Sequence, residues 1–248
     1  MKPMLVYPIA ATEAVRYAVQ NLVEADIPIV DHPTPDVTHL LLDIPSFTEN
    51  GNLRSGKEIT QYLQMLPSDI TIVGGNLNHP ALSEYRTVDF LQDSRYLAMN
   101  AAITADCALR VAAPLLSTSI WDTPTLIIGW GRIGKCLVRL LQGLGCNVTV
   151  AARKETDRAT LQSLGIPAVD MDASLHKFRL IFNTAPEPVL ERQITQCRNC
   201  IKIDLASRQG LKGDDVILAR ALPGKMVPES SGRQIAETFL RLCKEETR

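Results

Sequence analysis

A glycine-rich turn between an apolar run and an amphipathic stretch constrains this chain more than any other feature. Residues 125–145 read TLIIGWGRIGKCLVRLLQGLG, in which a buried strand over 125–128 is expected to lead into the turn. The pattern GxGxxG is weak evidence by itself, but strand, turn and helix in this order are what a dinucleotide-binding fold requires. The predicted inner stripe of the helix is Ile133, Cys136, Leu137, Leu140, Leu141 and Leu144.

The turn has the residues that a bound diphosphate needs. Gly129 permits the tight turn, Gly131 lets the backbone approach the pyrophosphate, and Gly134 lets helix and strand pack closely. The free amides and the dipole at the helix start then attract the negative charge. The residues expected to bind the cofactor here are Gly129, Trp130, Gly131, Arg132, Ile133 and Gly134. The alternative is a glycine-rich turn that binds nothing.

The end of the next predicted strand indicates which nucleotide is bound. A site specific for NAD usually has an acidic residue there, which bonds the ribose 2′-hydroxyl. This chain has Arg153 and Lys154 instead, and a guanidinium can bind a 2′-phosphate through two bonds. Glu155 is the competing candidate for the acid, but it lies beyond Arg153 and is better placed to start the next turn. The sequence therefore favours NADP over NAD; a solvated cluster of charges is the plainer interpretation.

Apolar runs alternate with helical stretches along the whole chain. The predicted strands lie at 4–7, 27–31, 38–43, 70–75, 125–129, 147–152, 179–183, 201–206 and 216–222. Strands separated by helices indicate the α/β class with parallel sheets. We expect two lobes: a C-terminal Rossmann domain with a doubly wound parallel sheet, and a smaller N-terminal α/β lobe of flavodoxin- or Rossmann-like form.

The expected domain boundaries follow from two helical stretches. A nearly all-round apolar helix over 96–116 is predicted to be buried between the lobes and to kink or end at Pro114. The N-terminal lobe is assigned to 1–95 and the Rossmann domain to 96–228. A terminal helix over 229–245 is expected to pack back on the first lobe, with Ser231 and Gln234 as a capping box at its start.

Composition excludes several classes of function. The 248 residues have 26 basic and 27 acidic side chains, so no single-signed field exists to recruit nucleic acid or an anionic membrane. A hydrophobic content of 46% is ordinary for a globular protein, and no run approaches the length of a membrane span. We therefore expect a cytoplasmic protein.

The six cysteines lie mostly in apolar runs, which is typical of free thiols in a reducing compartment. Cys197 and Cys200 form a single CxxC pair without the further ligands that a zinc site needs. No metal is expected, and a loop leading into a strand is favoured over a redox or metal role.

Several further motifs carry a resemblance to known proteins. Residues 183–186 read NTAP, 204–208 read DLASR, 221–228 read ALPGKMVP and 231–235 read SGRQI. With the glycine turn, these segments resemble the family of dipicolinate synthase A subunits, within the D-2-hydroxyacid dehydrogenase-like superfamily. The resemblance covers most of 93–245 and is weaker over 1–92, where this chain is shorter than the usual form.

The resemblance implies a function, a partner and further site residues. It implies an NADP-binding oxidoreductase that forms dipicolinate from a dihydro- or hydroxytetrahydro-dicarboxylate, together with the flavoprotein B subunit of dipicolinate synthase, in the mother-cell cytoplasm of sporulating bacteria. Arg208 would bind a substrate carboxylate, and Lys225 with the helix start at Ser230 and Ser231 would complete an anion site. Cofactor contacts are implied for Asn183, Thr184 and Ala185. Plainer interpretations are a loop cap for Arg208 and a solvated lysine for Lys225.

One departure concerns the acid–base group. The superfamily has a catalytic histidine just after the proline that precedes the last helix, but Glu229 follows Pro228 here. Glu229 could replace it if burial raised its pKa, although an exposed or capping glutamate is the plainer interpretation. Asp106 is a second candidate, with an ion pair to Arg110 as the alternative.

Ser46, Gly75 and Asn76 follow predicted strands of the first lobe and are candidate substrate contacts. Two other functions stay open: an orphan 2-hydroxyacid dehydrogenase, which the missing histidine disfavours, and a nucleotide-sensing module without catalysis. A homo-oligomer is compatible with the sequence but is not indicated by it.

Overall fold

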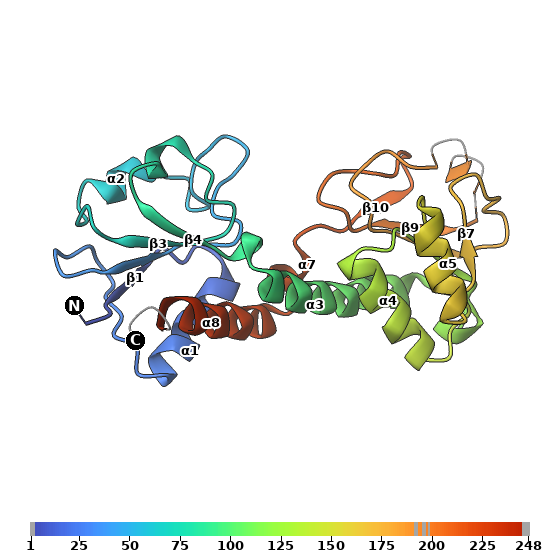
Figure 1. Cartoon of the computed structure of the whole chain (residues 1–248), viewed down its shortest axis with the longest axis horizontal. Coiled ribbons are helices and arrows are strands. Elements are labelled where there is room, and N and C mark those ends of the chain that lie inside the picture. Colours follow the sequence, from blue (N-terminus) through green and yellow to red (C-terminus); the bar gives the residue numbers. More distant parts are fainter. Residues whose placement is uncertain (1–2, 191–192, 195–196, 198, 245–248) are drawn as a thin grey trace. The chain divides into compact units, whose positions relative to one another are not determined.

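The computed structural model describes residues 3–190, 193–194, 197 and 199–244. The chain forms two compact units, one of residues 1–100 with 223–248 and the other of residues 101–222. Figure 1 labels the elements, and each unit is considered by itself.

The second unit is built on a six-stranded parallel sheet in the order β10-β9-β8-β5-β6-β7. Its strands are β5 (Thr125–Ile128), β6 (Val148–Ala151), β7 (Ala168–Val169), β8 (Leu180–Asn183), β9 (Ile201–Asp204) and β10 (Val216–Leu218). Numbered within the unit, this is the 3-2-1-4-5-6 order of dinucleotide-binding folds, and the strand order reverses between β5 and β8. The predicted Rossmann sheet is therefore confirmed.

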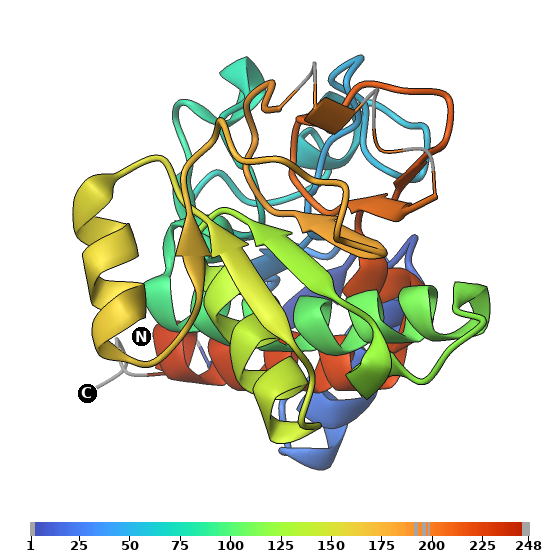
Figure 2. The same ribbon diagram turned by 90° about the vertical axis from the view of Figure 1, so that its right-hand side faces the viewer.

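Two helices cover part of this sheet. α4 (Arg132–Gly143) packs on β5 and β6, and α5 (Glu155–Ser163) packs on β7 (Figure 2). β5, β6 and β8 are buried along their whole length, as expected for parallel strands covered on both faces. The predicted inner stripe of α4 is partly wrong, because Leu140 and Leu144 are 38% and 54% exposed. Its six positions span a wider arc than the sheet covers, and Gly134, Leu137, Val138 and Leu141 form the buried face.

The first unit has a four-stranded parallel sheet in the order β1-β2-β3-β4. Its strands are β1 (Val6–Pro8), β2 (His39–Leu41), β3 (Thr71–Gly74) and β4 (Arg86–Asp89). The strand predicted over 27–31 is reduced to a parallel bridge between Ile29 and Val6. Counting that bridge, the order is 2-1-3-4-5, as in flavodoxin, with the reversal between β1 and β2.

The helices of the first unit come from both ends of the chain. α1 (Glu13–Glu24) and α8 (Pro228–Lys244) lie side by side (Figure 1). Gly232 allows this close contact, because a Cβ there would lie 2.5 Å from the Ala14 carbonyl oxygen. The remaining helices are α2 (Thr60–Leu63), α7 (Leu222–Met226) and 3₁₀ turns at Pro80–Leu82, Phe90–Gln92, Ala113–Leu115 and Ile120–Asp122.

Two helix predictions need correction. α3 (Ser94–Ala112) ends just before Pro114 as expected, but it is not buried all round, because Met99 is 53% exposed and Arg110 lies at the surface. The capping box is also wrong, since α8 begins at Pro228 and the Ser231 amide donates to the Val227 carbonyl inside the helix. Proline is favoured at a first helical position, and this signal outweighs the serine three residues later. Among the described residues, no helix is long and apolar enough to cross a membrane.

Candidate functional site

The glycine turn between β5 and α4 has the form that a bound diphosphate requires. Gly129 has φ 99°, and a Cβ there would lie 2.7 Å from Thr184 Oγ1. A Cβ at Gly134 would lie 2.2 Å from the Gly129 carbonyl oxygen, so helix and turn pack as closely as predicted. A Cβ at Gly131 would meet no atom within 4 Å, and no side chain of the described residues caps α4. The turn therefore leaves open space at a helix N-terminus, which fits a dinucleotide.

The loop after β8 packs against this turn through two side chains. Thr184 Oγ1 donates to the Ile128 carbonyl at 2.9 Å. Asn183 is fully buried; its Nδ2 donates to the Ala185 carbonyl at 3.0 Å and its Oδ1 accepts from the Ala185 amide at 3.1 Å. Asn183 and Thr184 therefore shape the loop from behind, while Ala185 faces a pocket. Direct cofactor contact by these three residues stays a prediction.

The pocket lies over the ends of β5, β6 and β8 and has a volume of about 190 Å³. Gly129 and Trp130 form one side, and Lys135 lies over the Trp130 ring at 5.5 Å. Both basic residues predicted to select the nucleotide, Arg153 and Lys154, line it. The position beside the strand reversal is where dinucleotide folds bind their ligand. The other lining residues include Ala151, Ala152, Asp157, Met171, Ala185, Pro186, Glu187 and Val189.

An ion pair that the sequence analysis did not anticipate lies in this pocket. Arg153 Nη1 donates to Glu187 Oε2 at 2.8 Å, joining the segments after β6 and β8. Arg158 fixes the same turn from its other side, since its Nη1 donates to the carbonyls of Ala152 and Arg153 at 2.8 and 2.9 Å. No local pattern predicts the pair, because its partners are 34 residues apart in the chain.

Asp204, at the end of β9, holds the loop that contains Arg208. It is fully buried, and its carboxylate accepts four hydrogen bonds of 2.8–3.1 Å, from Asn183 Nδ2 and from the amides of Ala206, Gly210 and Leu211. Arg208 itself is exposed and makes no hydrogen bond or ion pair with any described residue. A loop-capping role for Arg208 therefore finds no contact to support it, and its guanidinium is available to an anion.

Asp106 has a partner of its own. Its carboxylate lies 2.9 Å from Arg110 Nε, one turn along α3, and the two side chains are about half exposed, at 49% and 55%. This is the ion pair considered as the alternative to catalysis. A role for Asp106 in proton transfer stays a prediction.

Three candidate substrate residues lie after β2 and β3 in the first unit. Ser46 is fully buried; its Oγ donates to the Asp43 carbonyl at 2.8 Å and accepts from the Gly75 amide at 3.1 Å. Asn76 is exposed, and its amide donates to Asp89 Oδ1 at 3.0 Å. Ser46 and Gly75 thus bind each other, and only Asn76 presents its side chain at the surface.

The candidates around the start of α8 differ in exposure. Lys225, in the last turn of α7, is exposed and forms no ion pair with a described residue. Glu229 is also exposed and lies 3.3 Å from Arg233 on the next turn. Ser230 is exposed, whereas Ser231 is buried. Burial therefore gives no reason for a raised pKa at Glu229.

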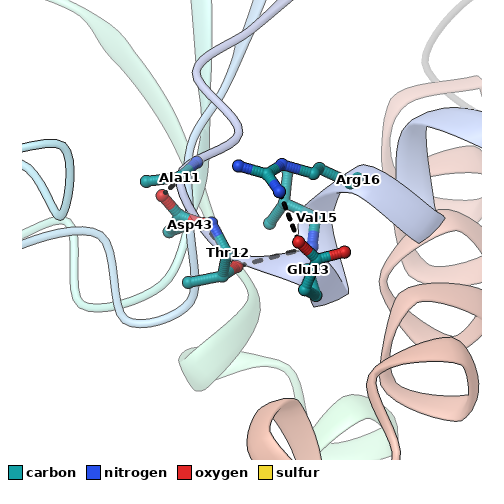
Figure 3. Close-up of polar contacts among 6 residues, drawn as sticks. All are labelled: Ala11, Thr12, Glu13, Val15, Arg16 and Asp43. Atoms are coloured by element: carbon teal, nitrogen blue, oxygen red, sulfur yellow. Dashed lines mark hydrogen bonds and ion pairs between the residues drawn. The ribbon is translucent and has the colours of Figure 1, made fainter.

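A further polar cluster lies at the strand reversal of the first unit (Figure 3). Asp43, buried after β2, accepts from the Ala11 amide at 3.2 Å, from the Thr12 amide at 2.9 Å and from Thr12 Oγ1 at 2.5 Å. Thr12 is the N-cap of α1, and Glu13 pairs with Arg16 on the exposed side. Asp43 therefore fixes the start of α1 at the edge where open α/β sheets bind ligands. The sequence signal for it was an acid directly after an apolar run.

The CxxC cysteines have a structural environment. Cys197 is buried, and burial together with the neighbouring Cys197 sulfur raises the pKa of the Cys200 thiol. A raised pKa disfavours the thiolate that metal binding and redox exchange need. Arg198, between them, lies outside the described residues, among which no group of three or more metal-ligating side chains occurs.

Residues 95–199 match the family of the D-isomer specific 2-hydroxyacid dehydrogenase NAD binding domain. The matched segment contains the glycine turn, the basic strand end and the loop after β8. This match supports an oxidoreductase with a nicotinamide cofactor. It does not distinguish NAD from NADP.

Similar proteins extend the likeness over nearly the whole chain. The A subunit of dipicolinate synthase from Bacillus subtilis (strain 168) is 22% identical over 237 residues, covering 86% of this chain and 80% of that protein. The crystal structure of the same component from Bacillus subtilis has a TM-score of 0.83 at 19% identity and covers 100% of this chain and 98% of that chain. The A subunit of dipicolinate synthase from Bacillus halodurans has a TM-score of 0.81 at 20% identity, covering 97% of this chain and 98% of that chain. At these identities the structures show a shared fold.

Proposed function

We propose that the protein is the NADP-binding subunit of a dipicolinate synthase, and that it oxidises a dihydro- or hydroxytetrahydro-dipicolinate together with a flavoprotein B subunit during sporulation. The observation that carries this proposal is the free guanidinium of Arg208. It lies in the loop after β9, at the same edge of the sheet as the nucleotide turn.

The cofactor part of the proposal rests on the end of β6. Arg153 and Lys154 line the pocket where an NAD-specific site would have an acid, and Glu155 lies in the first turn of α5 outside the pocket lining. The 2′-phosphate of NADP offers a guanidinium two charge-assisted hydrogen bonds. A bound nicotinamide would supply the hydride acceptor.

The substrate part rests on charge. A pyridine dicarboxylate precursor is a small dianion, and Arg208 is a cation fixed in place without an internal partner among the described residues. Asp204 orients the backbone of its loop, so the guanidinium need not order that loop when the substrate binds. Lys225 and Asn76, exposed in the first unit, are proposed to contact the rest of the substrate.

The oxidation needs a destination for electrons and protons. Converting the dihydro compound to the aromatic pyridine removes two electrons and two protons, formally a hydride and a proton. The glycine turn accounts for one nucleotide, and the flavoprotein is proposed as the second redox component. The similar Bacillus subtilis protein is one lettered component of its synthase, which supports the existence of a partner.

The proposed function is tested by reconstitution. The purified chain would be mixed with the dihydrodicarboxylate, NADP⁺ and the candidate flavoprotein, and the absorbance of the pyridine product followed. The proposal expects product from the complete mixture and a large loss with Arg208→Ala. The same rate with flavoprotein alone, or with a 2-oxoacid reduced instead, would contradict it.

A further inference from the structure

We infer that Glu187 is a specificity-determining residue of the nucleotide pocket, whose carboxylate competes with the 2′-phosphate of NADP for Arg153. The inference rests on the proposed binding of NADP at Arg153. It adds that the preference for NADP is restrained by an acid donated from a different loop.

The ion pair spans the pocket. Arg153 follows β6 and Glu187 follows β8, and these two strands flank β5 on opposite sides in the sheet. Both residues line the same pocket, and Arg153 Nη1 donates to Glu187 Oε2 at 2.8 Å. A ligand that enters between the two loops therefore meets a guanidinium that already has a partner.

The pair is positioned to exchange partners. The two side chains are 74% and 62% exposed, so neither is locked by packing. Other contacts hold the two loops: Arg158 bonds the carbonyls of Ala152 and Arg153, and Asn183 bonds both Ala185 and Asp204. Because exposed ion pairs contribute little to stability, Glu187 has no large structural role that its removal would disturb.

The chemistry makes the effect specific to NADP. A 2′-phosphate that binds Arg153 displaces the Glu187 carboxylate and is left near a like charge, so Glu187 opposes the phosphate twice. NAD has a 2′-hydroxyl in place of the phosphate. It neither competes for the guanidinium as an anion nor repels the carboxylate, so its affinity should be nearly independent of Glu187.

The test compares NADPH and NADH binding by calorimetry in the unmodified chain and in Glu187→Gln, which has nearly the same shape without the charge. We expect Glu187→Gln to bind NADPH about three- to tenfold more tightly and NADH within about twofold. The gain should shrink at high salt, because the groups are exposed. Glu155→Gln removes an acid from the same neighbourhood but outside the pocket lining, and it should leave both affinities within about twofold.

The outcomes separate this inference from the proposed function. If Arg153→Ala loses NADPH affinity while Glu187→Gln leaves it unchanged, the NADP site stands and the role of Glu187 is refuted. If Glu187→Gln weakens NADH binding severalfold, Glu187 bonds the ribose hydroxyl directly and the inference is also refuted. If the unmodified chain prefers NADH and Arg153→Ala has no effect, the NADP proposal itself fails.

Discussion

The buried carboxylate of Asp204 accepts a hydrogen bond from Asn183 Nδ2 at 3.1 Å, which joins the carboxyl ends of neighbouring strands β9 and β8. The same carboxylate binds three backbone amides of the loop that contains Arg208, and Asn183 in turn fixes the Ala185 backbone at the nucleotide pocket. One buried acid thereby supports both the proposed cofactor loop and the proposed substrate loop.

We predict that Asp204→Asn destabilises the second unit by about 2–4 kcal/mol, because an amide would face buried N–H groups with fewer acceptor sites. Trp121 and Trp130 are the protein's two tryptophans and both lie in this unit, so urea unfolding followed by tryptophan fluorescence reports on it. The exposed neighbour variant Asp214→Asn should change stability by no more than about 0.5 kcal/mol. Equal unfolding curves for the two variants would contradict the structural role of Asp204.

We predict that the chain binds NADPH more tightly than NADH and that Arg153→Ala sharply narrows the preference. Loss of a charge-assisted bond to the 2′-phosphate should cost about 1.5–3 kcal/mol, or about ten- to a hundredfold in affinity. Calorimetry with both nucleotides checks this. Equal or tighter binding of NADH by the unmodified chain would refute it.

Arg208→Ala should weaken dicarboxylate binding and leave NADPH affinity nearly intact, because Arg208 is exposed and without an internal partner among the described residues. Substrate titration of the NADPH-loaded protein measures the first effect. Thermal unfolding is the control. A variant with lower stability and an unchanged titration would show that Arg208 supports the loop instead.

Asp93 and Arg241 provide a pH-dependent prediction for the first unit, where Arg241 Nη2 lies 2.5 Å from Asp93 Oδ1. Burial alone would raise the pKa of Asp93, but the Tyr96 amide and the Arg241 guanidinium outweigh it and hold this pKa below its usual value. A lowered folded-state pKa stabilises the protein above the unfolded-state pKa, and this stabilisation is lost as the pH falls through the folded value.

Arg241→Gln should therefore cost about 1–3 kcal/mol at pH 7 and progressively less below about pH 4. Urea unfolding followed by circular dichroism at both pH values measures the difference. Arg233→Gln breaks an exposed pair with Glu229 and should cost less than about 1 kcal/mol. A penalty for Arg241→Gln that does not change with pH would contradict the assignment.

The parts of the fold that could be predicted are those encoded by short-range pattern. β5, the glycine turn and α4 follow one another within twenty residues, and each glycine has a steric reason that the sequence alone supplies. β4 was not predicted, because its residues RTVD are half exposed and form no apolar run. The strand expected at 27–31 has the apolar run but makes only a single bridge.

The site was predictable to the same extent. Arg153, Lys154 and Arg208 were found because each follows an apolar run at a ligand-binding edge. Glu187, Asp204 and Asp43 act through partners 34, 21 and 31 residues away, and such pairings depend on strand order, which no local pattern contains. Ser46 shows the converse, since a serine in a suitable place has its hydroxyl bonded inside the unit.

Finally, we predict that the isolated chain makes little or no dipicolinate and needs the flavin-carrying partner. Glu229 and Asp106, the two acids considered for proton transfer, are exposed or half exposed and each lies beside an arginine on the next helical turn, which favours the carboxylate over the acid form. The chain would be supplied with the dihydrodicarboxylate and NADP⁺, and pyridine absorbance followed with and without the candidate flavoprotein. Product should form in repeated turnovers only when both proteins are present. Repeated turnovers by the chain alone would refute the prediction and would make Asp106→Asn and Glu229→Gln the first variants to test, with the pH dependence of the rate showing which carboxyl group transfers the proton.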